Sequence, residues 1–424
     1  MTFYKETNLQ ETQIGKIPQD WKSVLINQIS EVRRGASPRP IGDPKYFSDK
    51  GRGWVRISDV TETYKYLRKT SQYLSELGES KSVKVNPGDL IMSICATIGR
   101  PILVDMEACI HDGFVVFRNL SKEMDTEFLF YVLQKYESKF AGMRQTGTQG
   151  NLNTNLVGNT LIPLPSLSEQ RGIVGVLGVV DSVIAKTGEV IAKTERLKKG
   201  LMQRLLTRGI GHKEYKQTPI GTIPKTWQVT TTSDVTLFIK DGTHTPPRRV
   251  ENGIPLFSAQ NIVDGKIVRT NEDTYITEEE YWKIHTKYEI QKNDVLLTIV
   301  GTIGNTAIVD VDYRFTLQRS VAIFRPDTEK IEPRFLHYAF QSDSFKRQLL
   351  GHSKLTTQGG VYLKELSSLM IPVPPFEEQH KITNILSSID AKLELEKKEK
   401  VRLERIKHGL MDLLLTGKIR VKVD

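Results

Sequence analysis

One stretch of the chain occurs twice and decides the fold. Residues 162–207 read IPLPSLSEQRGIVGVLGVVDSVIAKTGEVIAKTERLKKGLMQRLLT, and residues 371–416 read IPVPPFEEQHKITNILSSIDAKLELEKKEKVRLERIKHGLMDLLLT. The two copies align without an insertion and are identical at 17 of 46 positions, where unrelated segments would share about three. A fixed register over this length indicates an element that cannot slip, because loops absorb insertions and long helices do not. We therefore expect one long helix in each copy.

Both copies carry the apolar periodicity of a helix that buries one face. Apolar residues step by three and four, through Ile173, Leu177, Val180 and Ile184 in the first copy and Ile382, Leu386, Ile389 and Leu393 in the second. Gly209 and Gly417 follow the stripes and suit left-handed caps. Each helix would have about 40 residues and a length on the order of 60 Å. Such helices rarely stand alone, so we expect the two to pack as an antiparallel coiled coil.

The remainder of the chain repeats more loosely. The segment Ile14–Pro18 with Trp21 recurs as Ile220–Pro224 with Trp227, and the offset drifts as it does in globular domains whose loops absorb insertions. Short β-branched or aromatic runs predict strands at Leu90–Ile94, Phe114–Phe117, Val295–Val300 and Val321–Phe324. We therefore expect an α+β fold with a pseudo-twofold internal repeat, in which two mixed α/β domains are separated by the two long helices.

Length and composition agree with several domains. A chain of 424 residues exceeds the roughly 250–300 residues at which single cores stop growing. The expected parts are a first domain at residues 1–166, a central helix at 167–209, a second domain at 210–375, and a distal helix with a C-terminal tail at 376–424. Two cysteines are too few for a disulfide framework, and no apolar run approaches the roughly 20 residues of a membrane span. We therefore expect a cytoplasmic protein.

The polar loops differ between the two domains although the segments around them match. A net charge of +10 permits a polyanionic partner, and basic, hydroxyl and amide side chains near glycine are those that contact phosphates and base edges. Different loops on one frame would read different sequences, although a solvated turn explains any single residue about as well. The candidate DNA-binding residues are Arg33, Arg34, Ser37, Arg39, Arg56, Ser58, Lys65, Arg68, Lys69, Thr148, Gln149, Lys240, Thr243, His244, Thr245, Arg248, Arg249, Gln260, Asn261, Thr357 and Gln358.

Some of these residues have a specific alternative role. Residues 148–149 and 357–358 align at the same offset as the helices, so we expect them to position the DNA backbone rather than to read the DNA sequence. Residues 56–60 and 258–262 are expected to form a strand edge, and the basic and aromatic residues at 64–69 would follow a phosphate backbone. An exposed amphipathic strand pair would explain the same pattern.

These motifs together resemble the specificity subunit of Type I restriction-modification systems. The resemblance rests on the Ile-Gly-x-Ile-Pro-x-x-Trp openings at 14–21 and 220–227, on the Thr-Ile-Gly segments at 97–99 and 302–304, and above all on the repeated helix copies. Each copy begins with Pro-x-Pro-x-x-x-Glu-Gln and ends in Gly-Leu-Met-x-x-Leu-Leu-Thr. The resemblance covers nearly the whole chain, in the order typical of the family.

The resemblance implies a function and partners. Two target recognition domains would each read one half of a split, asymmetric double-stranded DNA site, and the helices would set the spacer and recruit two adenine methyltransferase subunits. Restriction subunits would join the complex, and S-adenosylmethionine would bind the methyltransferases, so this chain would need no cofactor. Candidate residues for methyltransferase contact or helix packing are Glu169, Gln170, Ile173, Leu177, Leu201, Leu205, Glu378, Gln379, Ile382, Leu386, Leu410 and Leu414.

No motif in the sequence predicts catalysis. The histidines lack the spacing of a helical metal pair, and no phosphate-binding glycine loop is followed by Lys-Ser or Lys-Thr. Residues 373–376 read Val-Pro-Pro-Phe, in which valine replaces the amide or carboxylate that an amino-methyltransferase loop needs. We therefore expect a non-catalytic chain without a metal. Two alternatives stay open: a partner-independent DNA nuclease, and a coiled-coil scaffold whose domains bind proteins.

Overall fold

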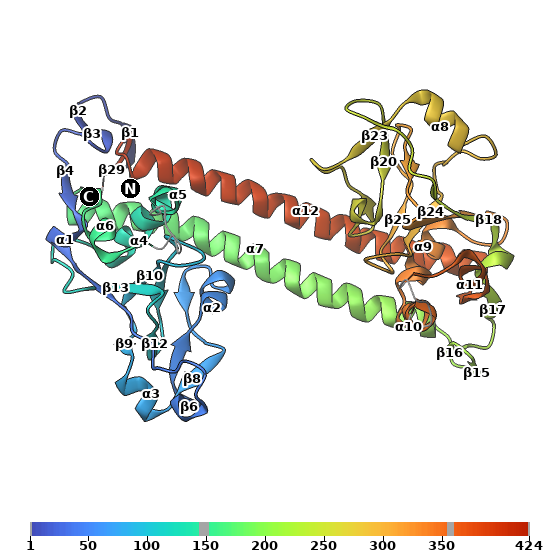
Figure 1. Cartoon of the computed structure of the whole chain (residues 1–424), viewed down its shortest axis with the longest axis horizontal. Helices are drawn as coiled ribbons and strands as arrows, with labels where there is room; N and C mark the ends of the chain where they lie inside the picture. The colour runs from blue at the N-terminus through green and yellow to red at the C-terminus, as the bar shows by residue number, and fades with distance from the viewer. Residues whose placement is uncertain (1, 144–151, 354–359, 423–424) are drawn as a thin grey trace. The chain divides into compact units, whose positions relative to one another are not determined.

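The computed structural model describes residues 2–143, 152–353 and 360–422. The chain forms two compact units, the first from residues 1–188 and 399–424 and the second from residues 189–398 (Figure 1). Two long helices, α7 (Leu167–Arg208) and α12 (Phe376–Leu414), each contribute one half to either unit. The two predicted long helices are therefore confirmed.

The first unit is a mixed α/β domain. Its strands are β1 (Thr2–Lys5), β2 (Leu9–Thr12), β3 (Gly15–Pro18), β4 (Lys22–Leu25), β5 (Glu31–Arg34), β6 (Phe47–Val55), β7 (Tyr66–Leu67), β8 (Gln72–Leu74), β9 (Val83–Val85), β10 (Leu90–Ser93), β11 (Pro101–Val104), β12 (Ala108–Ile110), β13 (Phe114–Arg118), β14 (Leu161–Leu164) and β29 (Ile419–Lys422). Its short helices are α1 (Ile26–Ile29), α2 (Ile57–Glu62), α3 (Glu76–Ser80), α4 (Thr126–Lys135), α5 (Glu137–Gly142) and α6 (Thr154–Gly158). The strands form sheets in the orders β5-β13-β10-β11-β7 and β8-β6-β12-β9, with smaller pairs around them.

The second unit repeats this plan. Its strands are β15 (Tyr215–Thr218), β16 (Gly221–Pro224), β17 (Gln228–Thr231), β18 (Thr236–Asp241), β19 (Arg249–Val250), β20 (Ile254–Phe257), β21 (Ile262–Val263), β22 (Lys266–Ile267), β23 (Thr274–Ile276), β24 (Val295–Thr298), β25 (Thr306–Ile308), β26 (Thr316–Leu317), β27 (Val321–Pro326) and β28 (Met370–Val373). Its short helices are α8 (Glu278–Ile284), α9 (Pro333–Gln341), α10 (Asp343–Ser353) and α11 (Leu363–Ser368). The sheet order β18-β27-β24-β25 matches β5-β13-β10-β11 of the first unit.

The long helices pack against each other within each unit, and their directions are antiparallel (Figure 1). In the first unit, Ile173 and Leu177 of α7 share one core with Leu414 of α12. In the second unit, Leu205 of α7 shares a core with Ile382 and Leu386 of α12. Each fully buried side chain of this size contributes roughly 1.5–3 kcal/mol of transfer free energy. The apolar stripes found in the sequence therefore bind each long helix to its units.

The two ends of the chain meet in the first unit. Strand β1 pairs with β29 in antiparallel register, from Thr2 opposite Lys422 to Lys5 opposite Ile419. The loop after α12 is closed by Gly417, whose φ of +68° is left-handed, as predicted for the cap. Within the described ranges, no helix is long and apolar enough to cross a membrane.

Candidate nucleic-acid interface

The polar loops that distinguish the two units leave the same position of the same sheet. The first loop follows β5, and the second follows β18. Both begin with a buried glycine, Gly35 or Gly242. A Cβ at Gly35 would lie 2.1 Å from the carbonyl oxygen of His111, and a Cβ at Gly242 would lie 2.1 Å from that of Leu317. Glycine is therefore required at both positions, because only a residue without a side chain lets each loop pack this closely against the turn that precedes β13 or β27.

In the first unit, Asp112 in that turn holds the loop. Its carboxylate accepts hydrogen bonds from Ser37 Oγ at 2.6 Å and from Arg39 Nη2 at 2.9 Å, and its carbonyl oxygen accepts one from Arg34 Nε at 2.7 Å. Burial alone would raise the pKa of Asp112, but the Ser37 hydrogen bond and the Arg39 charge outweigh it and hold the pKa below its ordinary value. Asp112 is thus an anion at neutral pH. Sequence reasoning missed it because its chemistry depends on a contact 73 residues away.

The second loop is held differently. His244 Nε2 lies 2.7 Å from Asp241 Oδ2, and the Thr243 hydroxyl donates to the carbonyl oxygen of Thr245 at 2.9 Å. Lys240 stacks over the ring of Tyr288, with its Nζ 4.5 Å from the ring centre. The candidates His244 and Thr245 are exposed. Two similar frames therefore present different polar groups to solvent.

Most of the predicted DNA-binding side chains are accessible. The exposed set consists of Arg33, Arg34, Arg39, Ser58, Arg68, Lys69, His244, Thr245, Arg248, Arg249 and Gln260, whereas Ser37, Arg56, Lys240 and Thr243 are partly buried. Arg68 is exposed although its Nε donates to Asp105 at 2.8 Å. Thr148, Gln149, Thr357 and Gln358 lie outside the described residues.

Two predicted DNA-binding residues point inward. Lys65 is 6% exposed, and its Nζ donates to Glu127 at 2.7 Å and to the Tyr131 hydroxyl at 3.0 Å. Asn261 is 1% exposed, and its amide nitrogen donates to Asp273 at 2.7 Å. Neither side chain is available to DNA in this arrangement, because each is buried and hydrogen-bonded inside its own unit.

The predicted strand edge at residues 56–60 and 258–262 is wrong for most of its length. Residues 57–62 form α2, and residues 259–261 form a 3-10 helix. Each short helix is capped by a side chain, since Asp59 accepts from the Arg56 backbone N–H at 2.8 Å and Asn261 accepts from the Ser258 backbone N–H at 3.0 Å. Such caps offer the backbone an alternative to a sheet, and they override the β propensity of these segments.

The Glu-Gln pair that starts each long helix fastens it to its domain. Gln170 accepts from the Asp125 backbone N–H at 2.8 Å, and Gln379 accepts from the Glu332 backbone N–H at 2.8 Å. Glu169 accepts from Trp21 Nε1 at 3.0 Å. Glu169, Gln170 and Gln379 are buried. These repeated residues therefore attach each long helix to its own domain.

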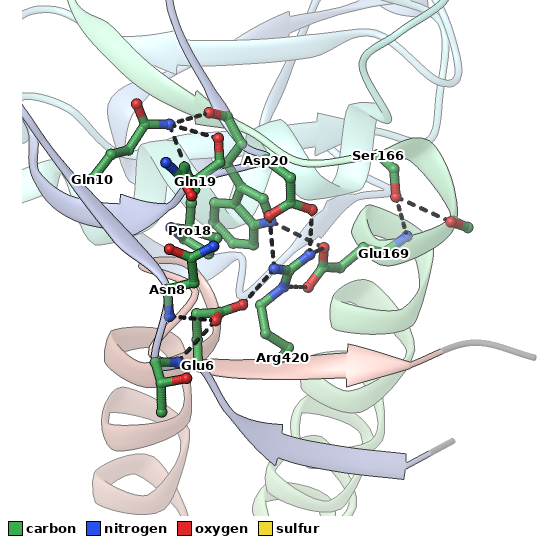
Figure 2. A network of polar contacts seen from close by, with 12 residues as sticks. Glu6, Asn8, Gln10, Pro18, Gln19, Asp20, Ser166, Glu169 and Arg420 are labelled. Atoms are coloured by element: carbon green, nitrogen blue, oxygen red, sulfur yellow. Dashed lines mark hydrogen bonds and ion pairs between the residues drawn. The ribbon is translucent and has the colours of Figure 1, made fainter.

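Arg420 completes the first of these helix starts (Figure 2). Arg420 is 8% exposed, and its guanidinium contacts Glu169 at 2.6 and 2.8 Å, Glu6 at 2.8 Å and Asp20 at 2.8 Å. Figure 2 shows these carboxylates arranged around it. In the second unit, the corresponding Glu378 contacts His212 at 2.9 Å instead. In each unit, the glutamate at the start of one long helix therefore contacts a basic residue that follows the end of the other long helix.

Both long helices also expose apolar side chains. Val179 of α7 is 66% exposed in the first unit, and Leu395 of α12 is 67% exposed in the second. Leu197 and Ile406, which correspond to each other in the repeat, are also exposed. The predicted helix contacts behave differently, because Ile173, Leu177, Ile382 and Leu386 are buried inside this chain. An exposed apolar position on a long helix is the kind of surface that a protein partner covers.

Comparison with known proteins identifies the family. The family model described as "Type I restriction modification DNA specificity domain" matches residues 18–196 and again residues 224–405. The chain belongs to this family. The match occurs once in each half, in agreement with the repeat. Among the described residues, no group of three or more His, Cys, Asp or Glu side chains is placed to hold a metal ion.

Relatives and solved structures extend the family match. The chain is 30% identical to the Type I restriction enzyme MjaVIII specificity subunit of Methanocaldococcus jannaschii, over all of this chain and 98% of that one. It is 24% identical to the EcoBI specificity subunit of Escherichia coli, over 94% of this chain and 85% of that one. A Type I specificity subunit from M. genitalium has the same fold, with a TM-score of 0.56, 15% identity, and coverage of 95% of this chain and 97% of that one. The family match thus holds across nearly the full chain.

Proposed function

We propose that each domain of this specificity subunit reads one half of a bipartite, asymmetric site in double-stranded DNA. The observation that carries this proposal is the pairing of a common frame with different loops. Gly35 and Gly242 start the two loops in the same way, yet Arg39 and His244 present different chemistry beyond them. Arginine favours guanine edges in the major groove, whereas other donor and acceptor sets favour other bases. Unlike loops predict unlike half-sites.

We further propose that α7 and α12 set the spacer between the half-sites and bind two adenine-N6 methyltransferase subunits. A helix pair of fixed length would keep the number of unread base pairs constant, as subunit geometry does for palindromic sites. The exposed apolar residues Val179, Leu197, Leu395 and Ile406 support a protein partner on the helices. Each unit exposes two of them, Val179 and Ile406 in the first and Leu197 and Leu395 in the second, which fits one copy of the partner on each unit.

In this proposal the chain itself does not catalyse. Methyl transfer to adenine requires the base to leave the stack, and the methyltransferase partners would bind S-adenosylmethionine and perform that step. Restriction subunits would join the same assembly. The complex would act on chromosomal DNA in the cytoplasm.

Modified-base sequencing of the host genome, with and without this gene, tests the proposal. We expect a split, asymmetric motif methylated at adenine in the parent strain and unmethylated in the deletion strain. Re-expression of the gene should restore the same motif. A lack of salt-sensitive DNA affinity in the purified protein, with or without its partner subunits, would instead support a protein-binding scaffold. Cleavage of DNA by the chain alone would support a nuclease.

A further inference from the structure

The turns before β13 and β27 correspond to each other bond by bond. Gly35 N donates to Phe114 O at 2.9 Å, and Gly242 N donates to Val321 O at 3.1 Å. Within the turns, Phe114 N donates to His111 O at 3.0 Å, and Val321 N donates to Gln318 O at 3.1 Å. These matching bonds place Asp112 of the first unit and Arg319 of the second at the same position.

The charge at this position is reversed between the two units. Asp112 is a partly exposed carboxylate that contacts Arg39 of its loop, whereas Arg319 is an exposed cation and strand β18 before its loop ends in Asp241. A carboxylate beside a DNA-binding loop lowers affinity, because it repels phosphates. Its presence in the first unit therefore needs a reason other than affinity.

The contacts of Asp112 supply that reason. Its two carboxylate oxygens are divided between Ser37 and Arg39, so the carboxylate fixes both side chains at once. The Arg39 side chain is 70% exposed despite this bond, which leaves the rest of its guanidinium available to a ligand. A charge-assisted hydrogen bond to one nitrogen restricts how a planar guanidinium can approach a base edge.

We propose that Asp112 is a positioning residue for sequence reading, which orients Arg39 toward the half-site recognised by the first domain at the expense of general DNA affinity. The inference rests on the proposed function, since it concerns how that domain reads DNA. The second domain has Arg319 at this position, and the carboxylate that contacts its loop residue His244 is instead Asp241, at the end of β18. The two domains would therefore differ in the position of this carboxylate and in the side chain that it orients, as well as in sequence preference.

The test measures the sequence preference of the assembled complex with its methyltransferase subunits, by selection from a DNA library randomised at both half-sites. Asp112→Asn keeps the acceptor for Ser37 and removes the charge that holds Arg39. We expect discrimination at one half-site to fall on the order of tenfold, with the other half-site unchanged. Affinity for unrelated DNA should rise a few-fold and should depend more steeply on salt.

Two controls separate positioning from charge and from folding. Glu107→Gln removes the same charge from an exposed carboxylate of the same domain, which pairs with Arg52 at 2.9 Å, and it should leave both half-site preferences intact. In an Arg39→Ala background, Asp112→Asn should cause no further loss of discrimination, because its effect acts through Arg39.

The possible outcomes separate the two proposals. A wild-type complex without any sequence preference would refute the proposed function itself. A selective wild-type complex whose preference is unchanged by Asp112→Asn would refute the inference alone. The inference would also be overturned if Asp112→Asn reduced discrimination further in the Arg39→Ala background, or if it reduced discrimination at both half-sites equally.

Discussion

Asp181 of α7 and Lys407 of α12 form a buried ion pair, with Lys407 Nζ 2.8 Å from Asp181 Oδ1. Their side chains are 8% and 7% exposed. The same carboxylate accepts hydrogen bonds from the hydroxyls of Tyr64 and Tyr131, at 2.8 and 2.6 Å. The second unit contains the equivalent pair of the repeat, in which Lys198 of α7 lies 2.5 Å from Asp390 of α12. Each unit is thus closed by a lysine from one long helix and an aspartate from the other.

Replacement of Lys407 by methionine should destabilise the first unit by about 3 kcal/mol, because it leaves the Asp181 charge buried without its cation. The apolar stem is largely kept, so packing changes little. Urea-induced unfolding, followed by circular dichroism, measures the change. Lys397→Met is the matched control on the same helix, since its partner Glu195 is half exposed, and it should cost less than about 1 kcal/mol. Equal effects of both variants would contradict the importance of the buried pair.

Replacement of Arg420 by methionine should loosen the junction of the two chain ends. It leaves Glu6, Asp20 and Glu169 close together without the guanidinium that they share, and we expect a loss of about 3–5 kcal/mol. Hydrogen exchange should show lost protection in β1 and β29 before the rest of the unit. Lys422→Met, at an exposed position of the same strand, is the control. Unchanged protection in the Arg420 variant would show that the strand pairing stands without the ion cluster.

His337 predicts a dependence of stability on pH. It is 8% exposed and its ring nitrogens contact Thr306 and Gln341, and burial lowers its pKa to about 4. An unfolded chain has a histidine pKa of about 6.5, so between pH 6.5 and about 4 the unfolded state binds more protons. The free energy of unfolding should therefore fall as the pH drops through this window, by up to about 1.4 kcal/mol per unit.

Urea unfolding at pH 7 and at pH 5 measures this dependence. His337→Gln should reduce the slope, even though it also lowers the stability at pH 7. His408→Gln is the control, because the His408 side chain is 81% exposed, and its slope should match the parent. An unchanged slope in the His337 variant would assign the pH dependence to other groups.

The sequence contains enough information for the repeat and for the long helices, because both depend on local periodicity. The predicted apolar stripe through Ile173 and Ile382 is the buried stripe of the structure. The strands at Leu90–Ser93 and Val321–Pro326 also follow from their composition. Such features are determined by residues close together in the chain. Because the two copies align at a fixed offset, each copy provides independent evidence for them.

Features that depend on distant partners were not predictable. Lys65 reads as an exposed cation within a basic run, yet Glu127 and Tyr131 draw it into the interior. Asp112 attracts no attention in the sequence, and its importance comes from loop residues folded against it. Local composition indicates which side chains can bind DNA, but only the tertiary contacts show which of them are free to do so.

Insertion of four residues after Thr187, with a matching insertion after Glu396 at the corresponding position of α12, tests the helices as a ruler. Four residues add about 6 Å and slightly more than one turn, so the apolar stripes stay nearly on their original faces. We expect the methylated motif to keep both half-sites and to gain one or two base pairs in its spacer, since base pairs are about 3.4 Å apart. Modified-base sequencing of cells that carry the variant measures both properties, and Thr187→Ala with Glu396→Ala, which adds no length, is the control. A motif with altered half-sites and an unchanged spacer would refute the ruler, because the helices would then influence what the domains read rather than how far apart they read it.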